Sequence, residues 1–223
     1  MIESAIGIIL RTQPLTDTSL IVRWLTPDLG RIDTVAKGAR RIQSPFLGKL
    51  DLFYRADFSF SRSRRSDLHT LREVSLRETH GALRQDIHRL RQAAYAASLV
   101  GQATETGTPL PAIFELMNGF LGCLCRQKSA PQFVLAFELK LLHELGLEPD
   151  LGETKLTPGT RQIVRALMQN DWPACSRLKP TSAQAGELLR FLDGFLVFHL
   201  GRVPKGRATA LMDDETRGSS RRY

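Results

Sequence analysis

The chain has 223 residues, of which 42% are hydrophobic, so it can bury one large or two small cores, and disorder throughout is excluded. Lysine and arginine number 31 against 23 aspartates and glutamates, which gives a formal net charge of +8 and a pI near 9.9. This excess favours a polyanion such as nucleic acid or an anionic membrane surface, with a basic but otherwise ordinary protein as an equal alternative.

The cysteines and the apolar segments indicate a soluble protein. Three cysteines, Cys123, Cys125 and Cys175, argue against a disulfide framework and favour a reducing cytoplasm. The opening MIESAIGIIL has an early acid and no basic leader, so we expect no signal peptide. The apolar runs around residues 6–10 and 191–200 are too short or too interrupted to span a bilayer, so we expect no membrane association.

The first 80 residues have the pattern of short β-strands separated by turns. Five β-prone segments are bounded by turn residues: 5–12, 19–26, 31–36, 51–60 and 68–75. Alternation is clearest in 51–60, where Ala56, Phe58 and Phe60 share one face and Phe53 breaks the rule by sharing the polar one. Five such strands predict a small closed barrel, which leaves no exposed sheet edge, and an SH3-like barrel fits the same pattern.

From residue 81 the hydrophobic period becomes helical. Helices are predicted over 83–105, 111–125 and 131–145, then from Thr157–Pro158, and finally from the capping box of Thr181 and Gln184 to Gly201. The last helix is apolar enough to be central to a second core. We therefore divide the chain into a barrel (1–80), a helical domain (81–203) and a disordered basic tail (204–223).

No motif in the sequence supports catalysis. There is no nucleophile elbow, P-loop, dinucleotide-binding glycine pattern or zinc-protease helix. The five histidines are scattered, and Cys123 and Cys125 lack the spacing of a structural zinc site. We therefore expect neither an enzyme nor a bound cofactor or metal ion.

Basic residues concentrate between positions 31 and 65. The segment has nine cations against three aspartates: Arg31, Lys37, Arg40, Arg41, Lys49, Arg55, Arg62, Arg64 and Arg65 against Asp33, Asp51 and Asp57. A small barrel with basic loops is a common surface for single-stranded nucleic acid, where cations follow phosphates and aromatic rings stack on bases. Phe53 and Trp24 are the candidate stacking rings, although packing inside the protein is the slightly favoured alternative for Phe53, and a solvated face is the alternative for the arginines.

The order of these features resembles the RecO family of bacterial DNA repair proteins. The matching stretches are DTSLIVRWLTPDLGRIDTVAKGARR, SPFLGKLDLF, DLHTLREVSL, FELKLLHELGLEPDL and GFLVFHLG. The resemblance implies an α+β protein with an N-terminal five-stranded OB-fold barrel followed by an all-α domain. It also implies a DNA recombination mediator, cytoplasmic and associated with the nucleoid, that acts after DNA damage and is not an enzyme.

The resemblance further implies partners. Family members bind single- and double-stranded DNA, perform strand annealing and, with RecR, help to load RecA onto DNA coated by single-stranded DNA-binding protein. The acidic, apolar C-terminal tail of that coating protein docks on the helical domain, for which Lys140 and Arg190 are candidate contacts. Residues 150–158 contain no cysteine where many relatives carry a four-cysteine zinc module, so we expect the version of the family without it.

The predicted DNA-binding residues combine the resemblance with the charge pattern. Lys37, Arg40 and Arg41 match the family's basic DNA-contacting loop, and Arg31 lies in the same matched block. The full predicted set is Arg31, Lys37, Arg40, Arg41, Phe53, Arg62, Arg64 and Arg65. Two alternatives stay open: an adaptor that acts mainly through its helical domain, and an RNA-binding barrel protein of translation.

Overall fold

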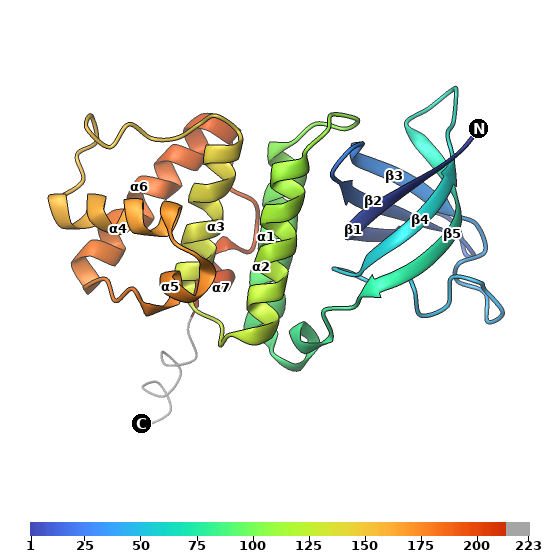
Figure 1. Cartoon of the computed structure of the whole chain (residues 1–223), viewed down its shortest axis with the longest axis horizontal. Coiled ribbons are helices and arrows are strands. Elements are labelled where there is room, and N and C mark those ends of the chain that lie inside the picture. Colours follow the sequence, from blue (N-terminus) through green and yellow to red (C-terminus); the bar gives the residue numbers. More distant parts are fainter. Residues whose placement is uncertain (213–223) are drawn as a thin grey trace. The chain divides into compact units, whose positions relative to one another are not determined.

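The computed structural model describes residues 1–212, which form a five-stranded barrel and a series of helices (Figure 1). The strands are β1 (Ile2–Pro14), β2 (Leu20–Thr26), β3 (Gly30–Ala36), β4 (Arg55–Ser61) and β5 (Leu68–Glu78). The helices are the 3-10 helix η1 (Gly81–Gln85), α1 (Ile87–Ala103), α2 (Pro111–Arg126), α3 (Pro131–Glu144), α4 (Pro158–Gln169), α5 (Trp172–Arg177), α6 (Ser182–Leu200) and α7 (Arg207–Ala210).

The described chain forms two compact units that do not follow a single cut in the sequence. One unit holds residues 1–81 together with 104–121, and the other holds 82–103 together with the part from 122 onward. The boundary expected at residue 80 therefore leaves out a later segment that groups with the barrel. No helix among residues 1–212 is long and apolar enough to cross a membrane.

The barrel closes in the strand order β1-β2-β3-β5-β4, with β1 pairing to both β2 and β4. Neighbouring strands are antiparallel except β3 and β5, which run parallel. This order is that of the OB-fold, whereas an SH3-like barrel lacks the parallel pair. The prediction of an N-terminal OB-fold followed by helices is confirmed.

Aromatic packing fills the barrel interior. Trp24 of β2 stacks on Phe58 of β4, with ring centroids 4.1 Å apart and planes at 12°, and its Nε1 donates a hydrogen bond to Thr34 Oγ1 at 2.9 Å. Gly7 of β1 makes room for this stack, because a Cβ there would lie 2.9 Å from the Phe58 ring and 3.1 Å from the Trp24 ring. Alternation along β4 holds as predicted, since Ala56, Phe58 and Phe60 are all buried.

The two predicted base-stacking rings lie inside the protein. Trp24 is fully buried and Phe53 is 1% exposed. Phe53 precedes β4, has a φ of 67°, and donates its backbone N–H to Ile9 O at 2.8 Å while its own carbonyl accepts from His80 Nδ1 at 2.7 Å. The alternation of the strand therefore does not extend to it. Of the two readings of Phe53, the structure shows the slightly favoured one, packing inside the protein, so the ring is not available to stack on nucleic-acid bases.

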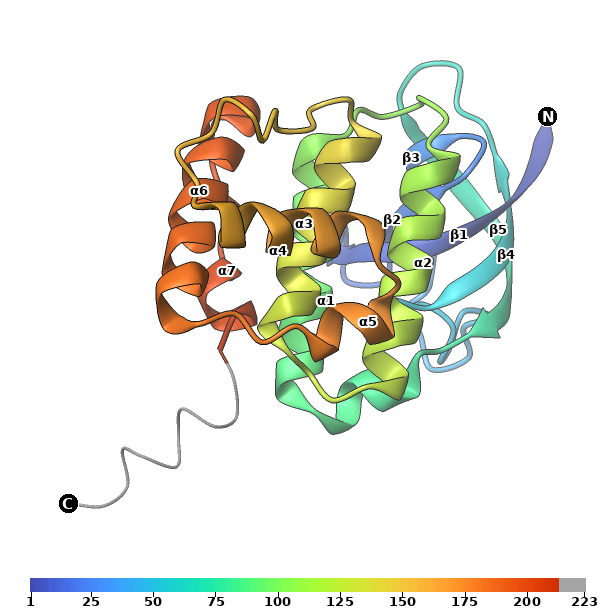
Figure 2. The same cartoon turned by 60° about the vertical axis from the view of Figure 1, so that its left-hand side comes forward.

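Most helix ends agree with the sequence signals. Thr157 caps α4 by accepting from Thr160 N, Thr181 and Gln184 form the capping box of α6, and Gly201 ends α6 with a φ of 75°. α4 lies between α3 and α6 (Figure 2). The helix predicted over 83–105 is in fact η1 followed by α1, since Asp86 Oδ1 accepts from His88 N at 2.8 Å and starts a new helix.

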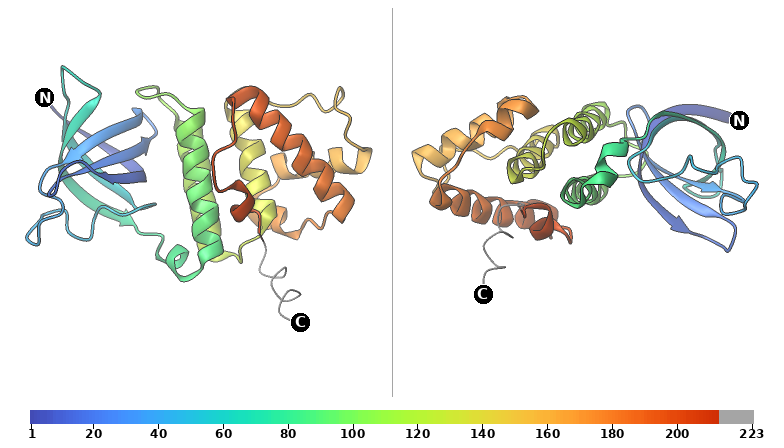
Figure 3. Two further views of the ribbon diagram at one scale, coloured as in Figure 1. Left: turned by 180° about the vertical axis from the view of Figure 1, so that it is seen from behind. Right: turned by 90° about the horizontal axis from the view of Figure 1, so that it is seen from below.

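The final helix and the tail differ from the prediction. α6 buries Leu188, Leu192 and Leu196 but leaves Phe198 82% exposed, so only one of its faces belongs to the core. Residues 204–212 are not disordered, because they contain α7, which packs against α1 (Figure 3). The rest of the predicted tail, 213–223, lies outside the described residues.

A buried polar network holds α7. Arg207 donates from Nε and Nη2 to Glu138 Oε1 and Oε2 at 2.6 and 2.8 Å, and Tyr95 Oη donates to Glu138 Oε1 at 2.5 Å. Gln92 Nε2 also donates to Ala210 O at 3.2 Å. Glu138 is fully buried, so its charge depends on these partners.

Replacing Arg207 with alanine should strongly destabilise the helical unit. The Glu138 carboxylate would stay buried without its cation, which costs about 3–5 kcal/mol in comparable buried pairs. Urea unfolding followed by circular dichroism measures the loss, and Arg202→Ala, at an exposed position beyond α6, is the control. A loss below about 1 kcal/mol would show that the network does not hold α7.

The stability of the barrel should rise with pH between 5 and 7 because of His69. Its ring is buried and stacks on the ring of Phe60, with the ring centroids 5.3 Å apart. Its Nδ1 accepts a hydrogen bond from Ser63 N at 3.4 Å, which requires that this nitrogen is unprotonated. Burial, and then the nearby Arg62, hold the pKa of His69 below its usual value. The unfolded chain therefore binds the proton more readily, and the stabilisation that is present above about pH 6.5 is lost on acidification.

His69→Phe should make this pH dependence shallower. Trp172, in the helical unit, is first replaced by phenylalanine in the unchanged protein and in the His69→Phe variant. The fluorescence of the remaining Trp24 then reports unfolding of the barrel in urea. Equal pH slopes with and without His69 would contradict the assignment.

Candidate nucleic-acid interface

The predicted basic residues lie in connections at the two ends of β3. Lys37, Arg40 and Arg41, here called the 37–41 cluster, follow the last residue of β3. Arg62, Arg64 and Arg65, the 62–65 cluster, lie in the β4–β5 connection, which enters β5 where Leu68 pairs in parallel with Asp33.

The second connection therefore lies toward the start of β3. Arg62 and Asp67 line one hollow together with Arg31 and Ile32, which agrees with this placement. The two clusters therefore lie toward opposite ends of β3, a strand of seven residues. The face of strands β2 and β3, with the β1–β2 and β4–β5 loops at its ends, is where OB-folds bind oligonucleotides.

The 37–50 connection is held by hydrogen bonds and by one buried ring. Arg40 N donates to Thr18 O at 3.0 Å and Arg40 Nη1 to Thr16 O at 3.2 Å, which ties the connection to the β1–β2 loop. Gly38 has a φ of 71°, the left-handed conformation that glycine adopts most easily. Phe46 is buried in the barrel core. The three cations of the 37–41 cluster are exposed, and in the part of the chain that the structure describes no carboxylate pairs with them.

The 62–65 cluster is partly neutralised. Arg62 forms a bidentate ion pair with Glu3, at 2.7 and 2.8 Å, and this hydrogen bonding holds the pKa of Glu3 below its usual value. The pair is exposed and contributes little to stability, so a phosphate can compete for Arg62. Arg64 and Arg65 are exposed.

Arg31 has a structural task. Its Nη2 donates to Thr104 O at 2.5 Å, which joins the barrel to the 104–121 segment of the same unit. The pKa of Arg31 lies below its usual value because of partial burial and then because of the nearby Arg23. Arg31 is therefore less available to a ligand than the cations of the 37–41 cluster.

Two further arginines lie on the outer side of the barrel. Arg23 of β2 pairs in register with Asp33 of β3 and binds it with two hydrogen bonds of 2.9 and 2.7 Å. Arg11 of β1 is exposed and lies opposite Arg23. Neither arginine is among the residues predicted from the sequence, although the alternation of Arg23 with buried Val22 and Trp24 indicates that its side chain points outward.

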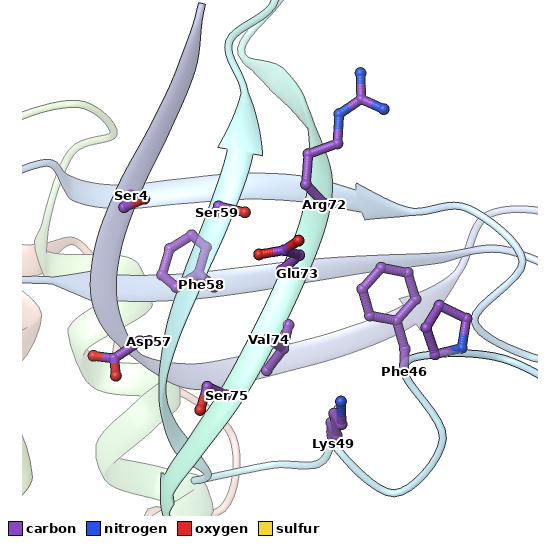
Figure 4. Close-up of a pocket in the computed structure, with 11 residues that line it drawn as sticks. Ser4, Phe46, Lys49, Asp57, Phe58, Ser59, Arg72, Glu73, Val74 and Ser75 are labelled. Atoms are coloured by element: carbon purple, nitrogen blue, oxygen red, sulfur yellow. The ribbon is translucent and has the colours of Figure 1, made fainter.

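A groove of about 400 Å³ lies along β1, β4 and β5, and Phe46 and Lys49 from the second half of the 37–50 connection also line it (Figure 4). Its lining combines hydroxyl, apolar, basic and acidic side chains: Ser4, Ser59, Ser75, Phe46, Val74, Lys49, Arg72, Asp57 and Glu73. Asp57 also forms an ion pair with Arg77. Because acids and bases alternate along this groove, it favours a polyanion less than the two clusters do.

The potential metal ligands and the thiols of the described residues are dispersed or buried. Among residues 1–212, no three His, Cys, Asp or Glu side chains gather at one place. Burial raises the pKa of the Cys123 thiol to about 12, and burial also raises the pKa of Cys175, so both remain protonated at neutral pH.

Comparison with known proteins agrees with this fold. The family model described as "Recombination protein O N terminal" matches residues 1–80, and "Recombination protein O C terminal" matches residues 84–154. Two curated relatives, both named DNA repair protein RecO, match part of the chain. The one from Alkaliphilus metalliredigens is 34% identical over 146 residues, which are 65% of this chain and 58% of the relative. The one from Rhodopirellula baltica is 33% identical over 143 residues, 64% of this chain and 53% of the relative.

A third relative matches almost throughout. DNA repair protein RecO of Anaeromyxobacter dehalogenans is 33% identical over 231 aligned residues, which cover 88% of this chain and 91% of the relative. The chain thus spans a little over half the length of the first two relatives and about nine tenths of the third. With both family models matched in order on an OB-fold barrel and the helices after it, the chain belongs to the recombination protein O (RecO) family.

Proposed function

We propose that this protein is a DNA-binding recombination mediator of DNA repair. It binds single- and double-stranded DNA in the cytoplasm, anneals complementary strands and, with RecR, helps to load RecA onto DNA coated by single-stranded DNA-binding protein. Family membership supports the biological role, and the charges and positions of residues in the barrel support the DNA contact.

The observation that carries the DNA contact is the charge of the 37–50 connection. Between Asp33 and Asp51 the chain has four cations, Lys37, Arg40, Arg41 and Lys49, and no acidic residue. The connection leaves the end of β3, beside the β1–β2 loop, in the region where OB-folds bind oligonucleotides. Its fixed backbone positions these cations before any ligand arrives.

Annealing requires a surface that holds a strand without occupying the base edges. Cations on phosphates position a strand and carry no sequence information. The tryptophan and all four phenylalanines within residues 1–81 are buried and Tyr54 is half-buried, so the barrel surface offers little aromatic area for stacking. Contact with about five phosphates of a single strand would give a slope of roughly −3.5 in log K against log salt concentration.

An adaptor role for the helical unit has some support from a groove beside α6. The groove has a volume of about 530 Å³ and is lined by Leu189, Arg190, Asp193, Val203, Arg207, Ala208 and Leu211. Apolar side chains beside the exposed Arg190 suit an acidic, apolar peptide, such as the tail of single-stranded DNA-binding protein, although Asp193 opposes an acid.

Lys140 suits that role less well. Its Nζ donates to Met168 O at 2.7 Å and Asn170 O at 2.9 Å and lies 5.7 Å from the centre of the Trp172 ring. It therefore binds the carbonyls at the end of α4, and an acidic peptide would have to displace it from them.

Replacing Lys37, Arg40 and Arg41 together with alanine should weaken DNA binding without unfolding the protein. The loss of three phosphate contacts should make the salt slope less negative by about 2 for a single strand, and annealing should slow. Fluorescence anisotropy at several salt concentrations measures the slope. The matched control replaces the exposed Arg165, Arg177 and Lys179 of the helical unit, which changes the net charge equally. An unchanged slope in the folded 37–41 variant would remove the site.

Arg190→Ala should weaken binding of an acidic, apolar tail peptide. An exposed ion pair contributes about 0.2–1 kcal/mol, so the loss should be up to about fivefold. Titration of the labelled peptide against the full chain measures it, with Arg165→Ala as the control. If the peptide instead competes with DNA and Arg190→Ala has no effect, the adaptor site beside α6 is wrong.

A further inference from the structure

The 37–50 connection exposes two large aliphatic side chains among its cations. Ile42 is 90% exposed and Leu47 is 67% exposed, and Leu15 of the adjoining β1–β2 loop is 45% exposed. Burying an isoleucine or leucine side chain contributes about 1.5–3 kcal/mol, so these side chains offer binding free energy that the fold leaves unused.

Their positions are fixed by the backbone around them. Successive turns connect Ser44 N to Arg41 O at 3.1 Å, Leu47 N to Ser44 O at 3.1 Å and Lys49 N to Phe46 O at 3.0 Å. Phe46, between the two aliphatic residues, is anchored in the barrel core beside β5 (Figure 4). Ile42 and Leu47 therefore project from an ordered surface.

The chemistry around these side chains indicates the ligand. Ile42 follows Arg41 directly, and Leu47 lies two residues before Lys49. A surface that alternates cations with aliphatic groups complements a chain that alternates phosphates with flat apolar rings. Leucine and isoleucine side chains are known to act as wedges between base steps, where they partly unstack the bases.

We propose that Ile42 and Leu47 contact the bases of the strand whose phosphates bind the 37–41 cluster, and that they separate neighbouring bases in its stack. This inference rests on the proposed DNA binding of the same connection. Aliphatic groups have no hydrogen-bonding atoms, so the contact is independent of sequence and leaves the Watson–Crick edges unoccupied. The two side chains supply the apolar base contact that the buried Phe53 and Trp24 cannot make.

The test uses the double variant Ile42→Ser/Leu47→Ser in the full chain. The probes are a single-stranded oligonucleotide containing 2-aminopurine, whose fluorescence rises when it unstacks, and an abasic oligonucleotide of the same length. Phe198→Ser, 82% exposed on α6, is the control for loss of an exposed apolar side chain, and the 37–41 triple-alanine variant is measured in parallel.

We expect the double variant to bind the normal strand about tenfold more weakly than the unchanged protein, with the same salt slope, because no phosphate contact is lost. Its affinity for the abasic strand should be unchanged, and the rise in 2-aminopurine fluorescence should disappear. The Phe198→Ser protein should behave like the unchanged chain.

Two results would overturn the inference. If the double variant keeps full affinity and the full fluorescence rise while the triple-alanine variant loses its salt slope, the connection binds phosphates without base contact by the aliphatic pair. If the triple-alanine variant also keeps the salt slope of the unchanged protein, the proposed DNA site itself is wrong, and so is the base contact that depends on it.

Discussion

The stack of Trp24 on Phe58 is the contact on which the outer surface of the barrel depends. The two rings come from β2 and β4, which are not neighbours in the sheet but lie on either side of β1. The stack therefore passes over β1, and it can do so because Gly7 has no side chain to meet it. Because Trp24 is fixed inward, the neighbouring Arg23 points outward, where it binds Asp33 of β3. On its other side, β3 pairs in parallel with β5. The two basic connections then lie toward opposite ends of one strand.

The periodicity of the sequence predicted the strands and helices, which are the parts of the fold that depend on regular backbone hydrogen bonding. All five strands, the starts of α4 and α6 and the end of α6 follow from alternation, caps and glycine, which are local signals. Phe53 was misplaced because alternation was extended through a residue with positive φ, where the backbone no longer alternates. The order in α7 was missed because it depends on Arg207 reaching Glu138, a partner 69 residues away that no local pattern indicates.

The density of positive charge in the sequence indicated the 37–41 cluster. It could not show which cations already bind carbonyl or carboxylate groups of the protein itself. Arg31 binds a backbone carbonyl and Arg23 binds Asp33, so part of the positive charge of the barrel serves the fold, whereas Arg62 binds Glu3 in an exposed pair for which a phosphate can compete. The exposure of Ile42 could not be predicted from the sequence either, because an aliphatic residue normally indicates a core position. Whether a cation is paired and whether an aliphatic side chain is exposed both depend on which residues remote in the chain lie close together in space. The composition of the sequence does not contain that information.

The arrangement has a consequence for how tightly a strand can be held. A surface that relied on exposed aromatic rings would gain about 1–3 kcal/mol per stacked base, and the bases would have to leave those rings before they could pair. In the barrel of this protein, Trp24 and the phenylalanines are buried, and the proposed DNA-binding surface consists of exposed cations and the exposed aliphatic pair Ile42 and Leu47. Under the proposed mode of binding, a strand would be held mainly through its phosphates, so its bases would have few contacts to give up before they pair with a complementary strand.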